Sequence, residues 1–316
     1  FYTERCEAMR NFANKIWNAS RFLMMNLTID KCQLPDKLEL EDKWILSKLN
    51  RVIPDITDNM DRYELGVAAQ KIYDFIWDDY CDWYIELTKT RLQGEDEDSK
   101  IRAQQVLCHV LTGMLKLLHP FMPFITEEIW QALPHEEGCQ AQFLMLDHWP
   151  QASEKLNFPA EEQAMEQIMD AIRAVRTRRS EMNVPPSKKA HLTVATDEAA
   201  VFQLGVPFLK KMAYASDVTI VPADQAPEAA GMVCVVTHVA QMFIPLGELV
   251  DLEKEKARVE KELKKNSAEL DKLNAKLANP GFVNKAPAHV VEAEQDRAEK
   301  LRALLAKLEE SAASMA

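Results

Sequence analysis

Glycine is scarce in this sequence. Only 8 of the 316 residues are Gly, and they are isolated from one another. A loop that cradles phosphate groups with its backbone needs several glycines close together, as in Gly-x-x-x-x-Gly-Lys or Gly-x-Gly-x-x-Gly. Neither pattern occurs. We therefore expect no nucleotide-binding loop of either kind.

Paired cysteines and long apolar runs are absent as well. The six cysteines are scattered, with no Cys-x-x-Cys pair, which is typical of reduced thiols in a cytoplasmic protein. No run approaches the ~18 apolar residues that a membrane helix needs. The chain starts at Phe1 in a pattern typical of the middle of a protein, without a recognisable signal peptide. We expect a cytoplasmic fragment of a longer protein and no membrane association.

The sequence also has no excess of positive charge. It contains 38 Lys and Arg residues against 50 Asp and Glu residues, so its formal net charge is −12 at pH 7. This average does not favour nucleic-acid binding, but a local basic face would be sufficient for it. The length of 316 residues is enough for two or three domains with cores of their own.

Residues 1–150 are expected to form a bundle of helices. Apolar residues recur there at three- and four-residue spacing, which is typical of helices with one buried face. In the first helix this buried stripe consists of Met9, Phe12, Ile16, Ala19 and Leu23. The predicted helices cover residues 2–29, 41–59 and 61–90, then a segment that ends at Leu118 and a short helix that ends near Leu133. Asp61 and Glu64 resemble a capping box at the start of the third helix.

Residues 151–247 are expected to form a small α+β domain. A helix is predicted over residues 161–182, and Pro185-Pro186 ends it. One strand, one helix and three further strands follow, an order that suggests helices packed on a small sheet. These elements are predicted at residues 190–195, 197–212 with Asp197 as the helix cap, 218–221, 232–236 and 241–246.

Residues 248–316 are expected to form an antiparallel coiled-coil hairpin, which makes the chain mainly α. Apolar residues alternate in steps of four and three from Leu249 to Leu277 and again from His289 to Leu308. Pro280-Gly281 lies between the two legs and cannot occupy a helix interior without cost. Three polar residues at seam positions weaken the seam: Lys256, Asn266 and Glu294.

One face of the first helix could contact RNA. Arg10, Asn14, Asn18 and Arg21 recur on a face apart from the apolar stripe, with Lys15 beside them. Asn can donate to and accept from base edges, and Arg can pair with phosphate or stack on a base. An ordinary solvated face explains the same pattern, so periodicity leaves both interpretations open.

Two further groups of basic residues could contact phosphates. The first lies near the end of the 161–182 helix, where cations also suit the helix dipole. The second lies at seven-residue spacing on an outer face of the arm, where charged residues usually form only solvated pairs. The first group is Arg173, Arg176, Arg178 and Arg179, and the second is Arg258, Lys265 and Lys272.

The sequence suggests no catalytic residue and no metal site. Cys108 and His109 are adjacent on a predicted helix and point in different directions. His135, Cys139 and His148 lack the paired spacing of zinc ligands. A self-contained enzyme is therefore the least favoured interpretation.

Three stretches together resemble part of the class I aminoacyl-tRNA synthetases. Residues 10–22 (RNFANKIWNASRF) resemble the opening helix of the anticodon-binding domain in the valine, isoleucine and leucine enzymes. Residues 119–130 (HPFMPFITEEIW) resemble the closing turn of that domain. The hairpin tip, residues 279–287 (NPGFVNKAP), is similar to that of the bacterial valyl-tRNA synthetase family. The resemblance covers the whole chain.

This resemblance implies a role for each part. The bundle would read the anticodon of tRNA(Val), and the arm would hold the outer corner of the tRNA. The family's catalytic motifs are missing, so the catalytic and editing sites, with their ATP and magnesium, would belong to other domains of the same enzyme. We expect no cofactor in this part, and a monomer whose partners are tRNA(Val) and those domains.

The resemblance also implies which residues would contact tRNA. The anticodon face would consist of Arg10, Asn14, Lys15, Asn18 and Arg21. The linker and arm would contribute Arg173, Arg176, Arg178, Arg179, Arg258, Lys265, Lys272 and Lys285. The alternative is a protein-interaction scaffold that grips partner helices with its hairpin. The net charge favours the scaffold slightly, and the Asn/Arg face and the tip sequence favour RNA binding.

Overall fold

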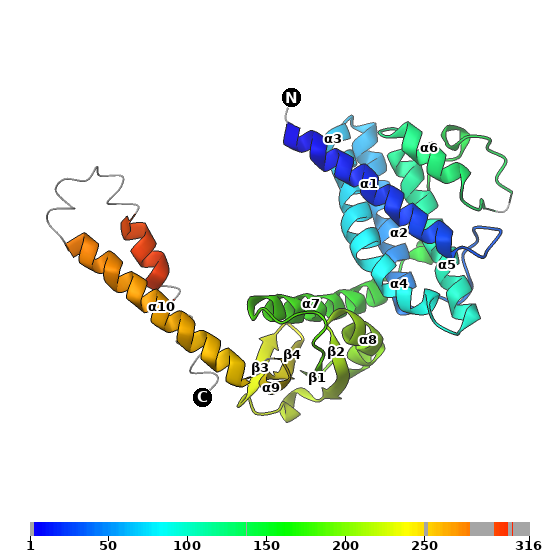
Figure 1. Ribbon diagram of the computed structural model, residues 1–316. Helices are drawn as coiled ribbons and strands as arrows, with labels where there is room; N and C mark the ends of the chain where they lie inside the picture. Colours follow the sequence, from blue (N-terminus) through cyan, green and yellow to red (C-terminus); the bar gives the residue numbers. More distant parts are fainter. Residues whose placement is uncertain (1–2, 137, 250–251, 279–293, 303–304, 306–316) are drawn as a thin grey trace. The chain divides into compact units, whose positions relative to one another are not determined.

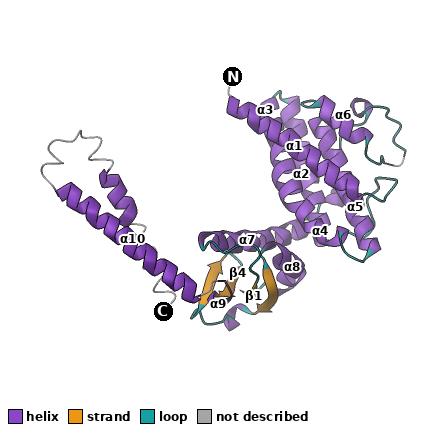
Figure 2. Cartoon of the chain, in the orientation of Figure 1, coloured by secondary structure: helices purple, strands orange, loops and turns teal. Residues whose placement is uncertain are grey.

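The computed structural model describes residues 3–136, 138–249, 252–278, 294–302 and 305 (Figure 1). The chain divides into two compact units, residues 1–167 and 168–316. Helices predominate, and all strands among the described residues belong to the second unit (Figure 2). Within the described part of the chain, none of the helices has the length and apolar character of a membrane span. The mainly α prediction is confirmed, and the three predicted domain boundaries stay predictions.

The first unit is a bundle of helices built around α5. Twelve of the 22 residues of α5 are buried, and α5 contacts each of the other five labelled helices of the bundle. Its neighbours enclose it because their apolar stripes all need a partner surface. The helices of the bundle are α1 (Thr3–Asn26), α2 (Leu40–Asp61), α3 (Leu65–Asp74), α4 (Ile85–Leu92), α5 (Glu97–Leu118) and α6 (Pro123–Gln131).

The apolar stripe of α1 is buried in the bundle with one exception. Phe12, Ile16, Ala19 and Leu23 are at most 8% exposed, as their spacing predicts. Met9 was expected in the same stripe, but its side chain is 52% exposed. The reason is that the helix reaches the core only at Phe12, and the side chains described before that position are all exposed.

The predicted helix 61–90 differs from the structure in two ways. Its start is not capped by Asp61, because α2 continues to Asp61 and α3 begins at Leu65. The Glu64 carboxylate instead accepts a hydrogen bond of 2.6 Å from the Asn59 amide. The middle of the segment, Phe75–Tyr84, is a π-helix that joins α3 to α4 without a break.

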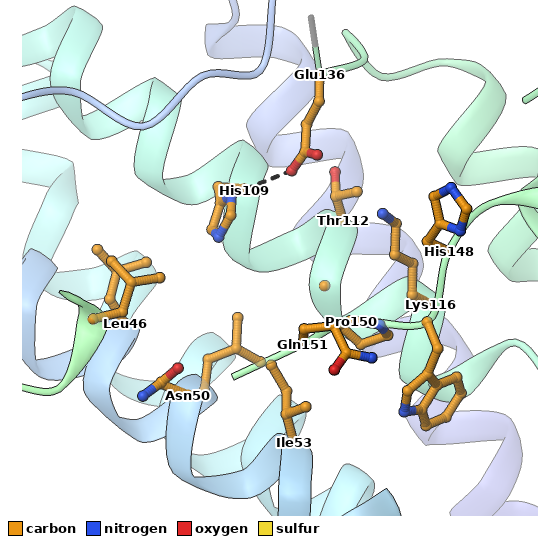
Figure 3. A pocket seen from close by; sticks show the side chains of 14 residues that line it. Leu46, Asn50, Ile53, His109, Thr112, Lys116, Glu136, His148, Pro150 and Gln151 are labelled. Carbon is orange, nitrogen blue, oxygen red and sulfur yellow. Dashed lines mark ion pairs between the residues drawn. The ribbon is translucent and has the colours of Figure 1, made fainter. Parts of the chain in front are cut away.

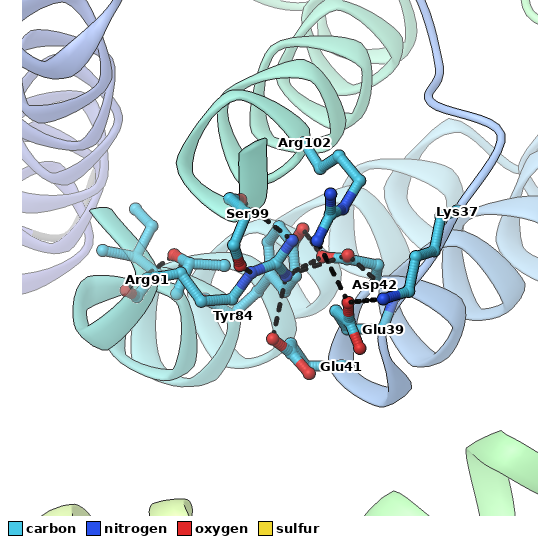
Figure 4. A network of polar contacts seen from close by, with 10 residues as sticks. Lys37, Glu39, Glu41, Asp42, Tyr84, Arg91, Ser99 and Arg102 are labelled. Atoms are coloured by element: carbon cyan, nitrogen blue, oxygen red, sulfur yellow. Dashed lines mark hydrogen bonds and ion pairs between the residues drawn. The ribbon is translucent and has the colours of Figure 1, made fainter. Parts of the chain in front are cut away.

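A buried cluster of charges joins α2, α4 and α5 (Figure 4). The Arg91 guanidinium donates to both carboxylate oxygens of Asp42 at 2.8 Å and to Glu41 at 2.8 Å. It also donates to the Ser99 hydroxyl at 3.0 Å, and the Tyr84 hydroxyl donates to Asp42 at 2.7 Å. The Asp42 side chain is 0% exposed. A buried carboxylate must be paired to be tolerated, and these donors satisfy it.

Glu41 is the less well compensated acid of this charge cluster. Burial raises the pKa of Glu41 to about 7, and the neighbouring Asp42 carboxylate adds to the rise, whereas Arg91 opposes it. The neutral form of Glu41 is therefore favoured in the folded chain more than in the unfolded chain. Stability that depends on this proton is present at acidic pH and is lost as the pH rises through about 7.

The second unit begins within α7 and contains a four-stranded sheet in the order β2-β1-β4-β3. β1 and β2 are parallel and are connected through α8, and the other two strand pairs are antiparallel. Gly205 of α8 lies so close to Ile168 of α7 that an added Cβ would be 2.8 Å from it. The elements are α7 (Pro159–Glu181), β1 (Ala190–Thr196), α8 (Ala199–Met212), β2 (Ala215–Val221), β3 (Met232–Val236), β4 (Ala240–Pro245), α9 (Leu246–Leu249) and α10 (Leu252–Ala278).

The predicted cap of α8 is wrong. Asp197 precedes the helix by two residues, and Glu198 occupies the cap position without a side-chain hydrogen bond to the helix. The hydroxyl of Thr196 accepts a hydrogen bond of 3.0 Å from the Glu198 N–H. The end of β1 therefore supplies the side-chain oxygen for this turn, because Thr196 is held in place by its own bond to the Val239 carbonyl.

The described part of the arm is an antiparallel pair of helical segments. Residues 294–302 are helical and lie beside α10. Lys276 Nζ lies 2.7 Å from the Glu294 carboxylate, and Arg297 lies 2.5 Å from Glu269. Later positions of α10 thus pair with earlier positions of the second leg, which defines the antiparallel direction.

The seam predicted between the two legs is confirmed at the described positions. Leu273 and Ala298 are buried, at 6% and 1% exposure. The other predicted seam residues whose side chains are described are half-buried, namely Leu263, Asn266, Leu270, Leu277, Glu294, Leu301 and Leu305. The predicted tip, residues 279–287, lies outside the described residues.

The substitution Glu41→Gln is expected to stabilise the chain, relative to the wild type, increasingly as the pH rises from about 5 to about 8. Gln keeps an acceptor for Arg91 and carries no charge that must be desolvated. Urea unfolding of both proteins across this pH range measures the difference between their free energies of unfolding. The same measurement at the acidic end is the internal control, because Glu41 is neutral there. A difference that does not change with pH would contradict the interpretation.

Candidate nucleic-acid interface

The outward face of α1 carries a row of exposed side chains, four polar and one aromatic. At about 100° per residue, Arg10, Asn14, Trp17 and Arg21 fall within about 60° of one another around the helix, with Asn18 beside them. All five side chains are exposed. We call these five residues the α1 face. Neither Arg10 nor Arg21 forms an ion pair within the part of the chain that the structure describes.

Lys15 belongs to another side of α1. Its ammonium group lies 2.7 Å from the Asp82 carboxylate and 3.6 Å from the centre of the Trp77 ring. The Trp77 ring in turn stacks on Tyr73, with 5.5 Å between ring centres. Lys15 therefore ties α1 to the π-helical segment. Its predicted tRNA contact stays a prediction, and the structure does not bring it together with the α1 face.

Trp17 is the member of the α1 face that the sequence reasoning missed. Its side chain is 47% exposed. The signal was present in the spacing of Arg10, Trp17 and Arg21, which differ by seven and four positions and share one helix face.

The four arginines near the end of α7 separate into two kinds. Arg173, Arg176 and Arg178 are exposed; Arg173 pairs with Asp170 at 2.7 Å, and Arg178 pairs with Glu181 at 3.3 Å. These three remain candidates for phosphate contacts, since exposed pairs of this kind are weak and exchange easily.

Arg179 does not lie on this surface. It is 3% exposed, and its guanidinium donates hydrogen bonds to the carbonyls of Pro185 and Lys188. The guanidinium carbon also lies 5.5 Å from the centre of the Tyr214 ring. The expectation that Arg179 faces phosphate is corrected by this burial, because the side chain holds the loop that follows α7.

The basic residues of the arm are only partly described. Lys265 and Lys272 are exposed on α10, seven positions or about 10.5 Å apart along the helix. Arg258 lies within α10, but its side chain is outside the described set, and Lys285 lies outside the described residues altogether. The structure therefore supports an outward orientation for two of these four predicted contacts.

A cavity of about 240 Å³ lies in the first unit between α2, α5 and the segment that follows α6 (Figure 3). Two polar contacts fasten this segment to α5: the His109 imidazole lies 3.5 Å from the Glu136 carboxylate, and the Lys116 ammonium group lies 2.9 Å from the Asp147 carboxylate. None of the predicted tRNA-contacting residues lines the cavity. Among the described residues, no group of three or more His, Cys, Asp or Glu side chains is placed to hold a metal ion.

Comparison with protein families finds two matches in this chain. Residues 42–195 match the model described as the anticodon-binding domain of tRNA ligase. Residues 251–316 match the model described as the valyl tRNA synthetase tRNA binding arm. The first match begins after α1, so the α1 face lies outside it. Together the two matches define the tRNA-contacting part of an aminoacyl-tRNA synthetase.

The curated relatives of this chain are valine--tRNA ligases. The valine--tRNA ligase of Clostridium acetobutylicum is 47% identical over 321 residues, which cover 100% of this chain and 36% of that protein. The valine--tRNA ligase of Carboxydothermus hydrogenoformans is 46% identical over 307 residues, which cover 94% of this chain and 34% of that protein. The chain belongs to the valine--tRNA ligase family, as the anticodon-binding domain and tRNA-binding arm. It spans about a third of the length of these relatives.

One solved structure is more distant. A LeuRS chain from Agrobacterium radiobacter matches 50% of this chain and 18% of its own, with 19% identity and a TM-score of 0.37. A similarity at this level adds nothing to the family relationship given by the sequences.

The substitution Arg179→Met is expected to lower the free energy of unfolding by about 2 kcal/mol, because the two loop carbonyls lose their donor inside the protein. Urea unfolding followed by circular dichroism measures the change. Arg176→Met is the matched control, since it removes the same charge from an exposed position of the same helix. Equal stability of the two variants would contradict a structural role for Arg179.

Proposed function

We propose that this chain is the tRNA(Val)-binding part of a valine--tRNA ligase. The bundle contacts the anticodon loop, and the arm holds the outer corner of the tRNA while other domains of the enzyme attach valine. The observation that carries the proposal is the α1 face, an exposed row of two arginines, two asparagines and a tryptophan. Unpaired bases in a loop can be stacked on aromatic rings and hydrogen-bonded at their edges, as these side chains allow.

The arm acts in this proposal by charge and position. Lys265 and Lys272 point outward from α10 at a spacing suited to two phosphates of one backbone. Such contacts carry no sequence information, so they fix the register of the tRNA and leave its identity to the bundle.

The remaining parts of the proposal follow the family. ATP and magnesium are used by a catalytic domain outside this chain, and this part carries no cofactor of its own. The enzyme acts in the cytoplasm as a monomer, and the catalytic and editing domains of the same polypeptide are the partners of this part.

A binding assay tests the proposal directly. The chain is titrated with valine tRNA, with the same tRNA carrying a changed anticodon, and with an unrelated tRNA at moderate salt. We expect the tightest binding to valine tRNA and an affinity that falls steeply as salt rises. Equal affinity for all three RNAs would contradict specific recognition. A dimer that ignores RNA would support a protein-interaction scaffold instead.

The double charge reversal Lys265→Glu with Lys272→Glu is expected to weaken tRNA binding at least tenfold and to lower the salt dependence by about two phosphate contacts. Filter binding at several salt concentrations measures both quantities. Lys264→Glu with Lys300→Glu is the matched control, because it makes the same charge change at other exposed arm positions. Circular dichroism monitors the helicity of all variants. Equal losses for the two pairs would mean that only the overall charge of the arm matters.

A further inference from the structure

We propose that Trp17 is a stacking platform for one unpaired base of the bound RNA, between two phosphate contacts made by Arg10 and Arg21. This inference rests on the proposed function and adds a residue-level mode of recognition to it. The α1 face then takes a short single-stranded segment, with one base on the indole and the backbone passing over the two guanidinium groups.

The first argument is that α1 has no structural need for an outward tryptophan. Its buried stripe is complete on the opposite side, where Phe12, Ile16 and Leu23 are at most 3% exposed. Tryptophan is large and mostly apolar, and leaving 47% of it in water forgoes much of the stability that its burial would supply. Because the buried stripe of α1 is complete without Trp17, its exposed indole indicates that this face of the helix binds a partner.

The second argument is the charge that surrounds the indole. From Arg10 to Arg21 the sequence contains no acidic residue, although the whole chain carries a net charge of −12. Neither arginine is committed to an ion pair among the described residues. An apolar ring between two unpaired cations fits a planar anionic ligand, and a nucleic-acid strand is such a ligand.

The third argument is spacing. Arg10 lies seven positions before Trp17 and Arg21 lies four positions after it, about 10.5 Å and 6 Å along the helix. The two cations thus bracket the indole over roughly 16 Å, a span that suits a few nucleotides of an extended strand.

The asparagines add a means of discrimination. Asn14 and Asn18 follow the same side of α1, about 60° and 100° around the helix from Trp17. A base stacked on the indole would present its edge toward them, and an amide can both donate and accept at that edge. We expect the asparagine amides to distinguish the identity of the base that stacks on Trp17.

The test uses the full chain and valine tRNA with the fluorescent base 2-aminopurine at one anticodon position at a time. Stacking on an indole quenches this fluorophore, so the wild type is expected to quench it at one position. Trp17→Leu should abolish that quenching and weaken binding by about five- to a hundredfold, as expected for the loss of one stacked base. Trp17→Phe should retain most of both effects because it keeps an aromatic face.

The matched control is Phe124→Leu, which removes another exposed aromatic side chain of the same unit, 90% exposed on α6. It should leave quenching and affinity unchanged. Trp17→Gln is a second variant with a polar side chain that suits an exposed helix position, and circular dichroism confirms that each variant is folded.

The outcomes separate the two proposals. If the wild type does not prefer valine tRNA, the proposed function is overturned and this inference falls with it. If the wild type binds valine tRNA specifically, while Trp17→Leu and Trp17→Gln bind it equally well with unchanged quenching, only the stacking role is overturned. In that case Trp17 would be assigned to a protein surface.

Discussion

The helix bundle depends on the pairing of one fully buried carboxylate. Asp42 lies on α2, and its partners Arg91 and Tyr84 come from the far end of the α3–α4 segment. Removing Arg91 would leave the buried Asp42 carboxylate without its positive partner, which is among the most costly changes in a protein interior. The contacts among α2, α4 and α5 are therefore fixed more narrowly than apolar packing alone would fix them, and α1 is presented to solvent by a bundle held in this way.

Much of this fold can be predicted from the local spacing of apolar residues in the sequence. The stripe of Phe12, Ile16 and Leu23 and the seam at Leu273 follow from helical periodicity, and the structure confirms both. The partnership of Asp42 with Arg91 could not be found in this way, because the two residues are 49 positions apart and meet only through packing. The π-helical segment was equally hidden, since its buried aromatic residues satisfy an α-helical pattern almost as well.

The candidate interface, too, could be predicted from sequence spacing only in part, because some of its residues form tertiary contacts that spacing does not show. Periodicity placed Arg10, Asn14, Asn18 and Arg21 on one exposed face, but it also placed Lys15 beside them. Only the tertiary structure reveals that Lys15 pairs with Asp82 and lies over the ring of Trp77. Arg179 was separated from its neighbours for the same reason. A basic residue near a helix end can serve a loop or a ligand, and burial decides which.

The π-helical segment Phe75–Tyr84 fixes the number of residues that can lie between α3 and α4. Its hydrogen bonds span five residues, so it accommodates extra residues that an α-helix of the same rise would not contain. Each residue deleted or inserted there would rotate everything that follows by about 100°. Arg91 on α4 would then point away from Asp42 on α2, and the salt bridge between them would be lost. The number of residues in this segment is therefore constrained by a salt bridge that lies beyond it.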